Sequence, residues 1–170
     1  DDPEAAEIRR AVTPKAALVG DFVDAAAAEI LHVRDRAGID AAQLHGNEPP
    51  ELIEALRAEG LFIVKTLFVN ASPLVGDAGR YPADAFLVEC AGGPLPGGNA
   101  LVWDWSEAKA ISPRHPLLVA GGVTTATVCR AVTASGADAV DVSSGVELAP
   151  GRKDLDEVAA FIDELARCAA

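Results

Sequence analysis

The chain has 170 residues and a net charge of −12 at pH 7, and half of its residues are hydrophobic. This length suits one domain over residues 1–170, and the acidic balance argues against a nucleic-acid partner, whose phosphates select a basic surface. No apolar run approaches the ~20 residues of a membrane span, so no membrane segment is predicted.

Strand-like and helical segments alternate along the chain. The first residues resemble a helix start, because Pro3 follows Asp2 and proline is favoured in a first turn. Apolar, β-branched runs predict strands at 17–23, 39–45, 61–69, 84–90, 116–121 and 137–143.

Helical patterns lie between these runs, at 24–36, 50–58, 124–134 and 155–168. We expect Asp24 to be the N-cap of the first of these helices. Asp154 is expected to cap the last helix, with Glu157 as its acidic partner three residues later.

Near-continuous apolar strands separated by helices predict a parallel sheet covered by helices. An open doubly wound sheet concentrates its site at one switch point, whereas a barrel gathers all strand ends around one mouth. Polar or small residues end nearly every predicted strand: Asp24, His45, Lys65, Glu89, Gly121-Gly122 and Ser143-Ser144. The pattern therefore favours an α/β fold of the (β/α)8 barrel class, with six strands visible. We expect a strand, a helix and a second strand to be missing at the front.

Three cysteines, Cys90, Cys129 and Cys168, lie far apart and follow no metal-ligand spacing. An odd, scattered set of this kind predicts reduced thiols in a cytoplasm and no metal site.

Seven segments of the chain carry distinctive motifs: LVGDFVD (18–24), AAQLHGNE (41–48), IVKTL (63–67), FLVEC (86–90), PGGNALVWDW (96–105), LLVAGGVT (117–124) and VDVSSGVELAPGRKD (140–154). In this order they resemble the motifs of the phosphoribosylanthranilate isomerase family. The QLHG motif and the long last motif are specific together, and the resemblance covers the whole chain.

The resemblance implies a cytoplasmic isomerase of tryptophan biosynthesis that is a monomer or a homodimer and uses no cofactor. It would convert N-(5-phosphoribosyl)anthranilate to 1-(o-carboxyphenylamino)-1-deoxyribulose 5-phosphate by an Amadori rearrangement. The family's general base, a cysteine in a Lys-x-Cys-Gly motif, and its basic loop for the anthranilate carboxylate have no counterpart in this sequence. A noncatalytic barrel that binds a phosphorylated ligand, either a pseudoenzyme or a partner subunit, therefore stays an alternative. So does an isomerase of a related amino-sugar phosphate.

The substrate phosphate is expected at Gly121, Gly122, Ser143, Ser144 and Gly145. In such barrels the loops after the last two strands form the phosphate site, and backbone approaches an anion closely only where side chains are missing. The alternative is that these residues serve only the geometry of the strand-end turns.

Glu89 is the candidate general acid, where the family carries an aspartate. An ungapped count from WDW would place Cys90 there instead, and a solvated strand-end carboxylate is the structural alternative. His45, Gly97 and Gly98 are expected to line the substrate, and the glycine-rich loop 92–100 is a candidate lid.

Three further residues are given structural roles. Asp104 is expected to cap the next helix. Lys65 points either to the mouth or into a core ion pair. Asp21 needs a partner inside its apolar strand, and Lys65 is the candidate.

Overall fold

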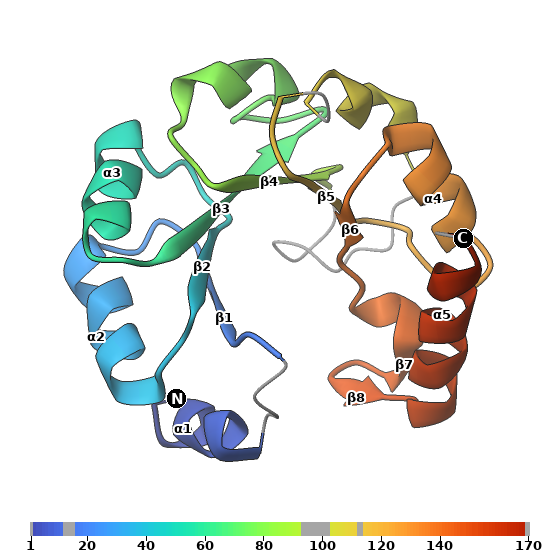
Figure 1. Cartoon of the computed structure of the whole chain (residues 1–170), viewed down its shortest axis with the longest axis horizontal. Helices are drawn as coiled ribbons and strands as arrows, with labels where there is room; N and C mark the ends of the chain where they lie inside the picture. Colours follow the sequence, from blue (N-terminus) through green and yellow to red (C-terminus); the bar gives the residue numbers. More distant parts are fainter. Residues whose placement is uncertain (1, 12–15, 93–102, 112–113, 169–170) are drawn as a thin grey trace. The chain divides into compact units, whose positions relative to one another are not determined.

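The computed structural model describes residues 2–11, 16–92, 103–111 and 114–168 (Figure 1). Each of the six predicted strands is present in the described part of the chain, with somewhat narrower bounds. They are β1 (Val19–Phe22), β2 (Ala41–Leu44), β3 (Phe62–Phe68), β4 (Ala85–Glu89), β5 (Leu117–Val119) and β6 (Ala139–Val140). They form a sheet in which the strand order follows the chain order, and the pairs whose register is resolved are parallel.

Helices connect these strands. They are α1 (Asp2–Ala11), α2 (Ala27–Ala37), α3 (Pro50–Ala58), α4 (Val128–Ser135) and α5 (Leu155–Cys168), with 3-10 turns η1 (Val75–Arg80), η2 (Trp105–Ala110) and η3 (Ser144–Val146). A short antiparallel hairpin of β7 (Glu147–Ala149) and β8 (Arg152–Lys153) precedes α5. The alternation of strands and helices read from the sequence is confirmed.

The chain divides into two compact units. Unit 1 comprises Asp1–Thr66 and Gly79–Ala85, and unit 2 comprises Leu67–Ala78 and Phe86–Ala170. The chain passes from one unit to the other three times: after Thr66 of β3, after Ala78 of η1 and after Ala85 of β4.

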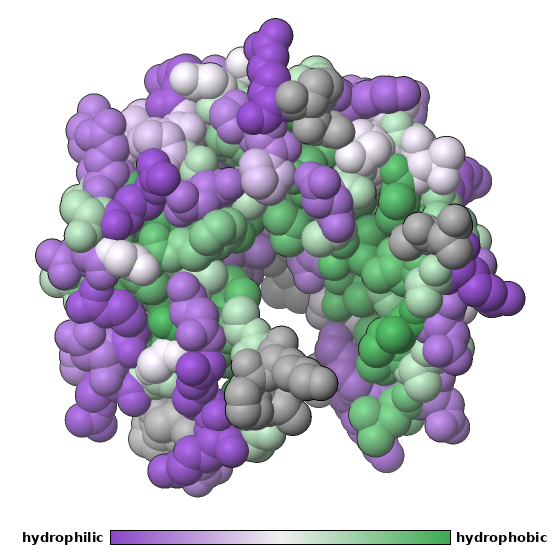
Figure 2. Space-filling model, viewed as in Figure 1, coloured by the Kyte–Doolittle hydropathy of each residue, from purple (hydrophilic) through white to green (hydrophobic). Residues whose placement is uncertain are grey.

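In unit 1, strands β1, β2 and β3 pack one face against α2 and α3. The buried cluster on that face contains Phe22, Ala42, Leu44 and Ile63 from the strands with Ile30, Ile53 and Leu56 from the helices. Full burial of each large aliphatic side chain contributes about 1.5–3 kcal/mol. Figure 2 shows hydrophilic residues over the outer sides of α2 and α3. Because side chains alternate along a strand, Asp21 and Gln43 project from the opposite face.

The expectation that Asp24 caps α2 is wrong. The N-cap is Ala26, which makes no side-chain cap hydrogen bond. Asp24 instead has a positive φ of 52°, and its carboxylate accepts a hydrogen bond from the Asn47 backbone N–H at 2.7 Å. A partner 23 residues further along the chain has replaced the local capping bond.

In unit 2, strands β4, β5 and β6 pair in parallel register, and α5 packs beside α4. The Asp154 carboxylate accepts from the N–H groups of Asp156 and Glu157, which confirms it as the cap of α5. The Glu157 side chain is not part of a capping box: it accepts a hydrogen bond from the Thr125 hydroxyl at 2.5 Å. Hydrophobic residues are exposed in the region of the hairpin and α5 (Figure 2), among them Leu148 and Leu155.

Two cysteines are joined, contrary to the expectation of three reduced thiols. Cys129 of α4 and Cys168 of α5 form a disulfide with a Cα–Cα distance of 5.2 Å. The two cysteines are 39 residues apart in the sequence. The pairing could not be predicted, because no sequence pattern indicates that the two helices lie side by side. Among the described residues, one group of side chains lies close enough together to hold a metal ion: Cys129, Glu164 and Cys168. The disulfide already uses both sulfurs of this group. Cys90 is a free thiol.

Among the helices that the structure describes, none combines the length and the apolar character required to cross a membrane.

Candidate active site

Two glycines follow strand β5 in unit 2, and both have left-handed backbone. Gly121 has φ 79° and Gly122 has φ 68°, a conformation that strains any residue with a Cβ atom. The sequence GG at this position is therefore required by the turn itself. It also leaves a stretch of backbone without side chains at the end of the strand.

The segment after β6 lies directly against this turn. A Cβ atom added at Gly145 would sit 2.1 Å from the carbonyl oxygen of Val123, a distance at which atoms overlap. Only glycine allows the two backbones to come so close. The segments 121–123 and 143–145 are thus neighbours in space, as expected for the ends of adjacent parallel strands. We call them together the glycine cradle.

Side chains that the sequence reading left unassigned hold the cradle in shape. Trp103 Nε1 donates to the Ala120 carbonyl at 2.9 Å, and Trp105 Nε1 donates to the Gly121 carbonyl at 3.2 Å. The Thr127 hydroxyl donates to the Gly122 carbonyl at 3.0 Å. Three consecutive carbonyls therefore have side-chain donors, which fixes the peptide orientations of the turn. The WDW motif was the available signal for the two tryptophans.

A lysine–glutamate ion pair lies beside the other half of the cradle. Lys153 Nζ donates to the Ser143 carbonyl at 2.8 Å, to the Ser143 hydroxyl at 3.2 Å and to Glu147 Oε1 at 2.8 Å. The hydrogen bond from Lys153 is the main reason that the pKa of Glu147 lies below its ordinary value. Ser144 begins the short turn η3 and is half-buried. Sequence reasoning missed Lys153, although it stands in the PGRKD part of the last motif.

Glu89 is the final residue of β4, and it is buried. Its backbone carbonyl accepts a hydrogen bond from the Val69 N–H at 3.1 Å. Cys90, the alternative at this position, comes after the strand and is half-buried.

The backbone beyond Glu89 is also held in place. Asn70 forms two hydrogen bonds with Ala91: its Nδ2 donates to the carbonyl at 2.6 Å, and its Oδ1 accepts from the N–H at 2.8 Å. These two hydrogen bonds join the segment that follows β3 to the segment that follows β4. The catalytic role of Glu89 stays a prediction.

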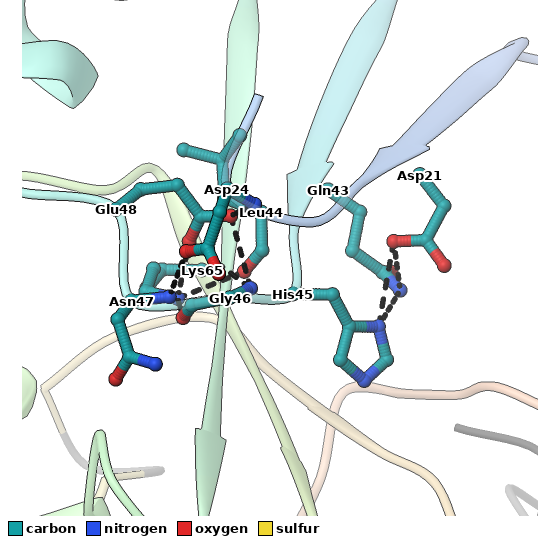
Figure 3. A network of polar contacts seen from close by, with 9 residues as sticks. All are labelled: Asp21, Asp24, Gln43, Leu44, His45, Gly46, Asn47, Glu48 and Lys65. Atoms are coloured by element: carbon teal, nitrogen blue, oxygen red, sulfur yellow. Dashed lines mark hydrogen bonds and ion pairs between the residues drawn. The ribbon is translucent and has the colours of Figure 1, made fainter. Parts of the chain in front are cut away.

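In unit 1, His45 follows β2 and its side chain is only 5% exposed. Its Nδ1 lies 3.3 Å from Gln43 Nε2 and 3.4 Å from Asp21 Oδ1 (Figure 3). The neighbours of Asp21 are therefore His45 and Gln43. The expectation that Lys65 pairs with Asp21 is wrong. The role of His45 toward a substrate stays a prediction.

Of the two orientations expected for Lys65, the structure shows the ion pair in the core and not the one that points to the mouth. Its Nζ lies 2.9 Å from Glu48 Oε2 and donates to the carbonyls of Leu44 and Gly46 at 3.0 and 2.6 Å (Figure 3). Burial lowers the pKa of Lys65 from 10.5, and the hydrogen bond with Glu48 opposes this shift. Glu48 was missed because the sequence gives no sign that a residue beyond QLHG returns to meet the end of β3.

Gly97, Gly98 and the glycine-rich part of the proposed lid lie outside the described residues. Asp104, at the edge of that loop, is the N-cap of η2 and accepts from the Ser106 N–H at 3.0 Å and from the Ser106 hydroxyl at 2.7 Å. Its expected capping role is confirmed.

Residues 2–164 match the family model described as N-(5'-phosphoribosyl)anthranilate (PRA) isomerase. A curated N-(5'-phosphoribosyl)anthranilate isomerase from Desulfatibacillum aliphaticivorans is 46% identical over 161 residues, which cover 95% of this chain and 74% of the relative. One from Paramagnetospirillum magneticum is 47% identical over 150 residues, covering 85% of this chain and 70% of the relative.

Solved structures agree with this result. The phosphoribosyl anthranilate isomerase of Thermotoga maritima superposes with a TM-score of 0.87 at 31% identity, covering 98% of this chain and 81% of that one. A phosphoribosyl anthranilate isomerase in complex with reduced 1-(o-carboxyphenylamino)-1-deoxyribulose 5-phosphate gives 0.84 at 30% identity, over 98% and 80% of the two chains. These structures are (β/α)8 barrels, which confirms the predicted fold class.

Proposed function

Because the chain belongs to the N-(5'-phosphoribosyl)anthranilate isomerase family, we propose that it converts N-(5-phosphoribosyl)anthranilate to 1-(o-carboxyphenylamino)-1-deoxyribulose 5-phosphate. This aldose–ketose isomerisation is a step of tryptophan biosynthesis. The observation that carries the proposal is the 46% identity to a curated isomerase over 95% of this chain. The family suggested by the sequence motifs is the one that the comparisons give.

The glycine cradle is proposed to bind the substrate phosphate. Its backbone can approach the anion closely, because Gly121, Gly122 and Gly145 have no side chains. The Ser143 and Ser144 hydroxyls add donors. The Lys153 ammonium, 2.8 Å from the Ser143 carbonyl, lies next to them, but Glu147 balances its charge, so the backbone N–H groups and the hydroxyls are the donors proposed for the phosphate.

The rearrangement needs one proton delivered and one removed. A proton must reach the ring oxygen as the bond between this oxygen and C1 breaks, which leaves an imine at C1. Removal of the C2 proton then gives an enolamine, which becomes the ketose. We assign the proton donor to Glu89. The family's cysteine base belongs to the Lys-x-Cys-Gly motif, which these 170 residues do not contain.

Turnover by the full-length protein tests this function, because consumption of the substrate changes its anthranilate fluorescence. Glu89→Gln removes the donor proton and should lower kcat by about 10²–10⁴-fold, the usual range for loss of a general acid. Glu89→Asp, which restores the residue type of the family, should retain far more activity. A folded full-length protein without turnover would reject the assignment as an isomerase.

The alternative is a noncatalytic barrel that binds a phosphorylated ligand. It is motivated by glutamate at position 89 in place of the family's aspartate. Both functions predict calorimetric binding of ribose 5-phosphate, and both predict that Ser144→Asp abolishes it by placing a negative charge in the cradle. Thr133→Asp, which adds the same charge at an exposed site on α4, is the matched control. Binding without turnover in the full-length protein would select the alternative.

The substrate class, a small phosphorylated molecule, follows from the same assignment. We propose that residues 1–170 belong to a single barrel domain, that the protein is cytoplasmic, and that it is a monomer or a homodimer. The Thermotoga maritima relative is described as dimeric. One cooperative unfolding transition, cell fractionation and sedimentation would test these three statements in turn.

A further inference from the structure

Three groups that can bind a metal ion come together in unit 2, where α5 lies beside α4 (Figure 1). They are the sulfurs of Cys129 and Cys168 and a carboxylate oxygen of Glu164, and the three ligand atoms lie within 4.8 Å of one another. Each of the three residues is half-buried. None of them belongs to the glycine cradle or to the other groups assigned to the isomerase reaction.

The two helices place these groups on facing surfaces. Glu164 and Cys168 are four residues apart in α5, so their side chains lie on the same side of that helix. Cys129 approaches this side from the first turn of α4, 35 residues before Glu164. Ligands from two separate helices leave no short spacing motif, which is why the cysteine pattern in the sequence gives no indication of a metal site.

The Glu164 carboxylate is directed at the sulfurs. Its Oε1 lies 3.3 Å from Cys129 Sγ, and its Oε2 pairs with the guanidinium of Arg167. A disulfide sulfur carries no hydrogen to donate, so in the oxidised protein the contact between Oε1 and Cys129 is not a hydrogen bond. A carboxylate that is oriented by one outer partner, with its second oxygen turned toward other ligand atoms, is typical of a metal site.

The disulfide must open before the two sulfurs can bind an ion. A thiol reductant breaks the S–S bond by supplying two electrons and two protons, and it is itself oxidised to a disulfide. The two cysteines are then thiols, the state favoured in the cytoplasm that we propose for the protein. A divalent cation that binds both sulfurs as thiolates displaces their two protons.

We propose that the reduced protein binds a thiophilic divalent cation, with Zn²⁺ as the natural ion, through Cys129, Cys168 and Glu164. Two thiolates and one carboxylate suit this four-coordinate ion, and a water molecule completes the coordination. Tetrahedral bonds of about 2.3 Å hold two sulfurs about 3.8 Å apart. The Cα atoms of the two cysteines are 5.2 Å apart, so rotation of the half-buried side chains reaches this spacing.

The ion thus connects α4 to α5 in the reduced protein, where the disulfide connects them in the oxidised protein. Because the same two sulfurs serve both links, the disulfide and the bound ion exclude each other. The site goes beyond the proposed isomerase function and does not depend on it.

Titration of Co²⁺ into the full-length protein, kept reduced with a phosphine, tests the proposal. We expect one tightly bound ion per chain, with charge-transfer absorption from thiolate to cobalt and the intense visible bands of tetrahedral cobalt. Ions held by surface carboxylates and water give no thiolate charge transfer, which separates the site from nonspecific binding to this acidic chain. Zn²⁺ added afterwards should remove the cobalt signals, because tetrahedral thiolate sites favour it. The oxidised protein should show no charge-transfer absorption.

Variants identify the ligands. Cys129→Ser and Cys168→Ser should each abolish tight binding, because one thiolate is lost. Glu164→Gln should weaken Co²⁺ binding by about tenfold or more, since loss of even an outer partner of a ligand costs about 10–100-fold. Cys90→Ser, which removes the free thiol, and Asp163→Asn, which removes an exposed charge from α5, are the matched controls. Both should bind like the wild-type protein.

The melting temperature gives a second measurement, with Zn²⁺ itself. A ligand that binds only the folded state stabilises it, so the Tm of the reduced wild-type protein should rise with the Zn²⁺ concentration, whereas that of Cys129→Ser should not. Absence of thiolate charge transfer in the reduced wild-type protein, or its persistence in Cys129→Ser, would overturn the site. Equal affinities of Glu164→Gln and the wild-type protein would overturn the role of the carboxylate. None of these measurements uses turnover, so the isomerase function and the metal site can fail separately.

Discussion

Lys65 and Glu48 form an ion pair that is closed to solvent: the side chains are 0% and 1% exposed, and Nζ lies 2.9 Å from Oε2. Glu48 also accepts the backbone N–H of Asp24 at 3.0 Å and that of Gly46 at 2.9 Å. The pair therefore joins β3 to the turns that follow β1 and β2. His45 lies next to one of these turns, so the geometry of the candidate site in unit 1 depends on this buried charge pair.

Lys65→Met should destabilise the protein by about 3–5 kcal/mol, because it leaves the Glu48 charge buried without its partner. Lys65→Met combined with Glu48→Gln should recover part of this loss. The amide oxygen that the second substitution introduces can still accept from a backbone N–H, and no charge stays buried. Urea unfolding curves give the free energies of unfolding.

Arg57→Met is the matched control for this prediction. Arg57 pairs with Asp84 at 2.8 Å, but its side chain is 44% exposed, so breaking that pair should cost no more than about 1 kcal/mol. If Lys65→Met costs no more than Arg57→Met, the pair does not stabilise unit 1 as inferred.

Gly145→Ala should damage the glycine cradle. Its Cβ atom would overlap the Val123 carbonyl oxygen, 2.1 Å away, and relief of the overlap must push the two backbone segments apart. We expect a loss of stability of about 1–3 kcal/mol, as for other overpacked sites. Calorimetry should also show weakened binding of ribose 5-phosphate.

Gly79→Ala controls for the loss of a glycine as such. A Cβ atom there meets nothing within 4 Å, so stability and phosphate binding should stay close to those of the wild-type protein. Equal behaviour of the two alanine variants would argue against a close contact between the two segments.

The parts of the fold that could be predicted are those set by local patterns. Helix α5 begins and ends at the predicted residues, 155 and 168, because its apolar positions recur every three or four residues. The neighbouring position of the two halves of the glycine cradle followed from the rule that successive parallel strands lie side by side.

The parts that could not be predicted depend on distant partners. Asp24 is of a residue type that commonly caps helices, but its carboxylate accepts a hydrogen bond from the Asn47 backbone N–H instead. The sequence indicates only that Glu48 lies in a turn after a strand. Its contact with Lys65 depends on how the strands pack in three dimensions. The position of Asp21 opposite Gln43 could not be predicted without the register of the two strands. A slip of one residue would move the side chains of one strand to the other face of the sheet.

Asp104 should make stability depend on pH at the acidic end. The hydrogen bonds from the Ser106 hydroxyl and N–H hold the pKa of Asp104 below its ordinary value of 3.8. Between the folded and the unfolded pKa the unfolded chain binds more protons, so stability falls as the pH falls. The contribution of Asp104 is complete above 3.8 and is lost as the pH drops through the folded pKa.

Asp104→Asn provides the comparison, because it keeps an acceptor oxygen and cannot titrate. The wild-type protein should be more stable than this variant at neutral pH, and the two should converge in acid. Thermal unfolding at a series of pH values measures the difference. A difference that does not change with pH would show that the Asp104 charge adds nothing to the cap.

The bond between Cys129 and Cys168 should be a main source of stability for α5. It closes a loop of 39 residues, and restricting the unfolded chain over such a loop stabilises the folded state by about 3–4 kcal/mol. Cys129→Ser should lower the free energy of unfolding by about this amount under oxidising conditions, and a thiol reductant should bring the wild-type protein to the same level. Cys90→Ser, which removes the free thiol, should do neither. If Cys129→Ser and the oxidised wild-type protein unfold at the same urea concentration, the disulfide adds no stability and packing alone holds α5 against α4.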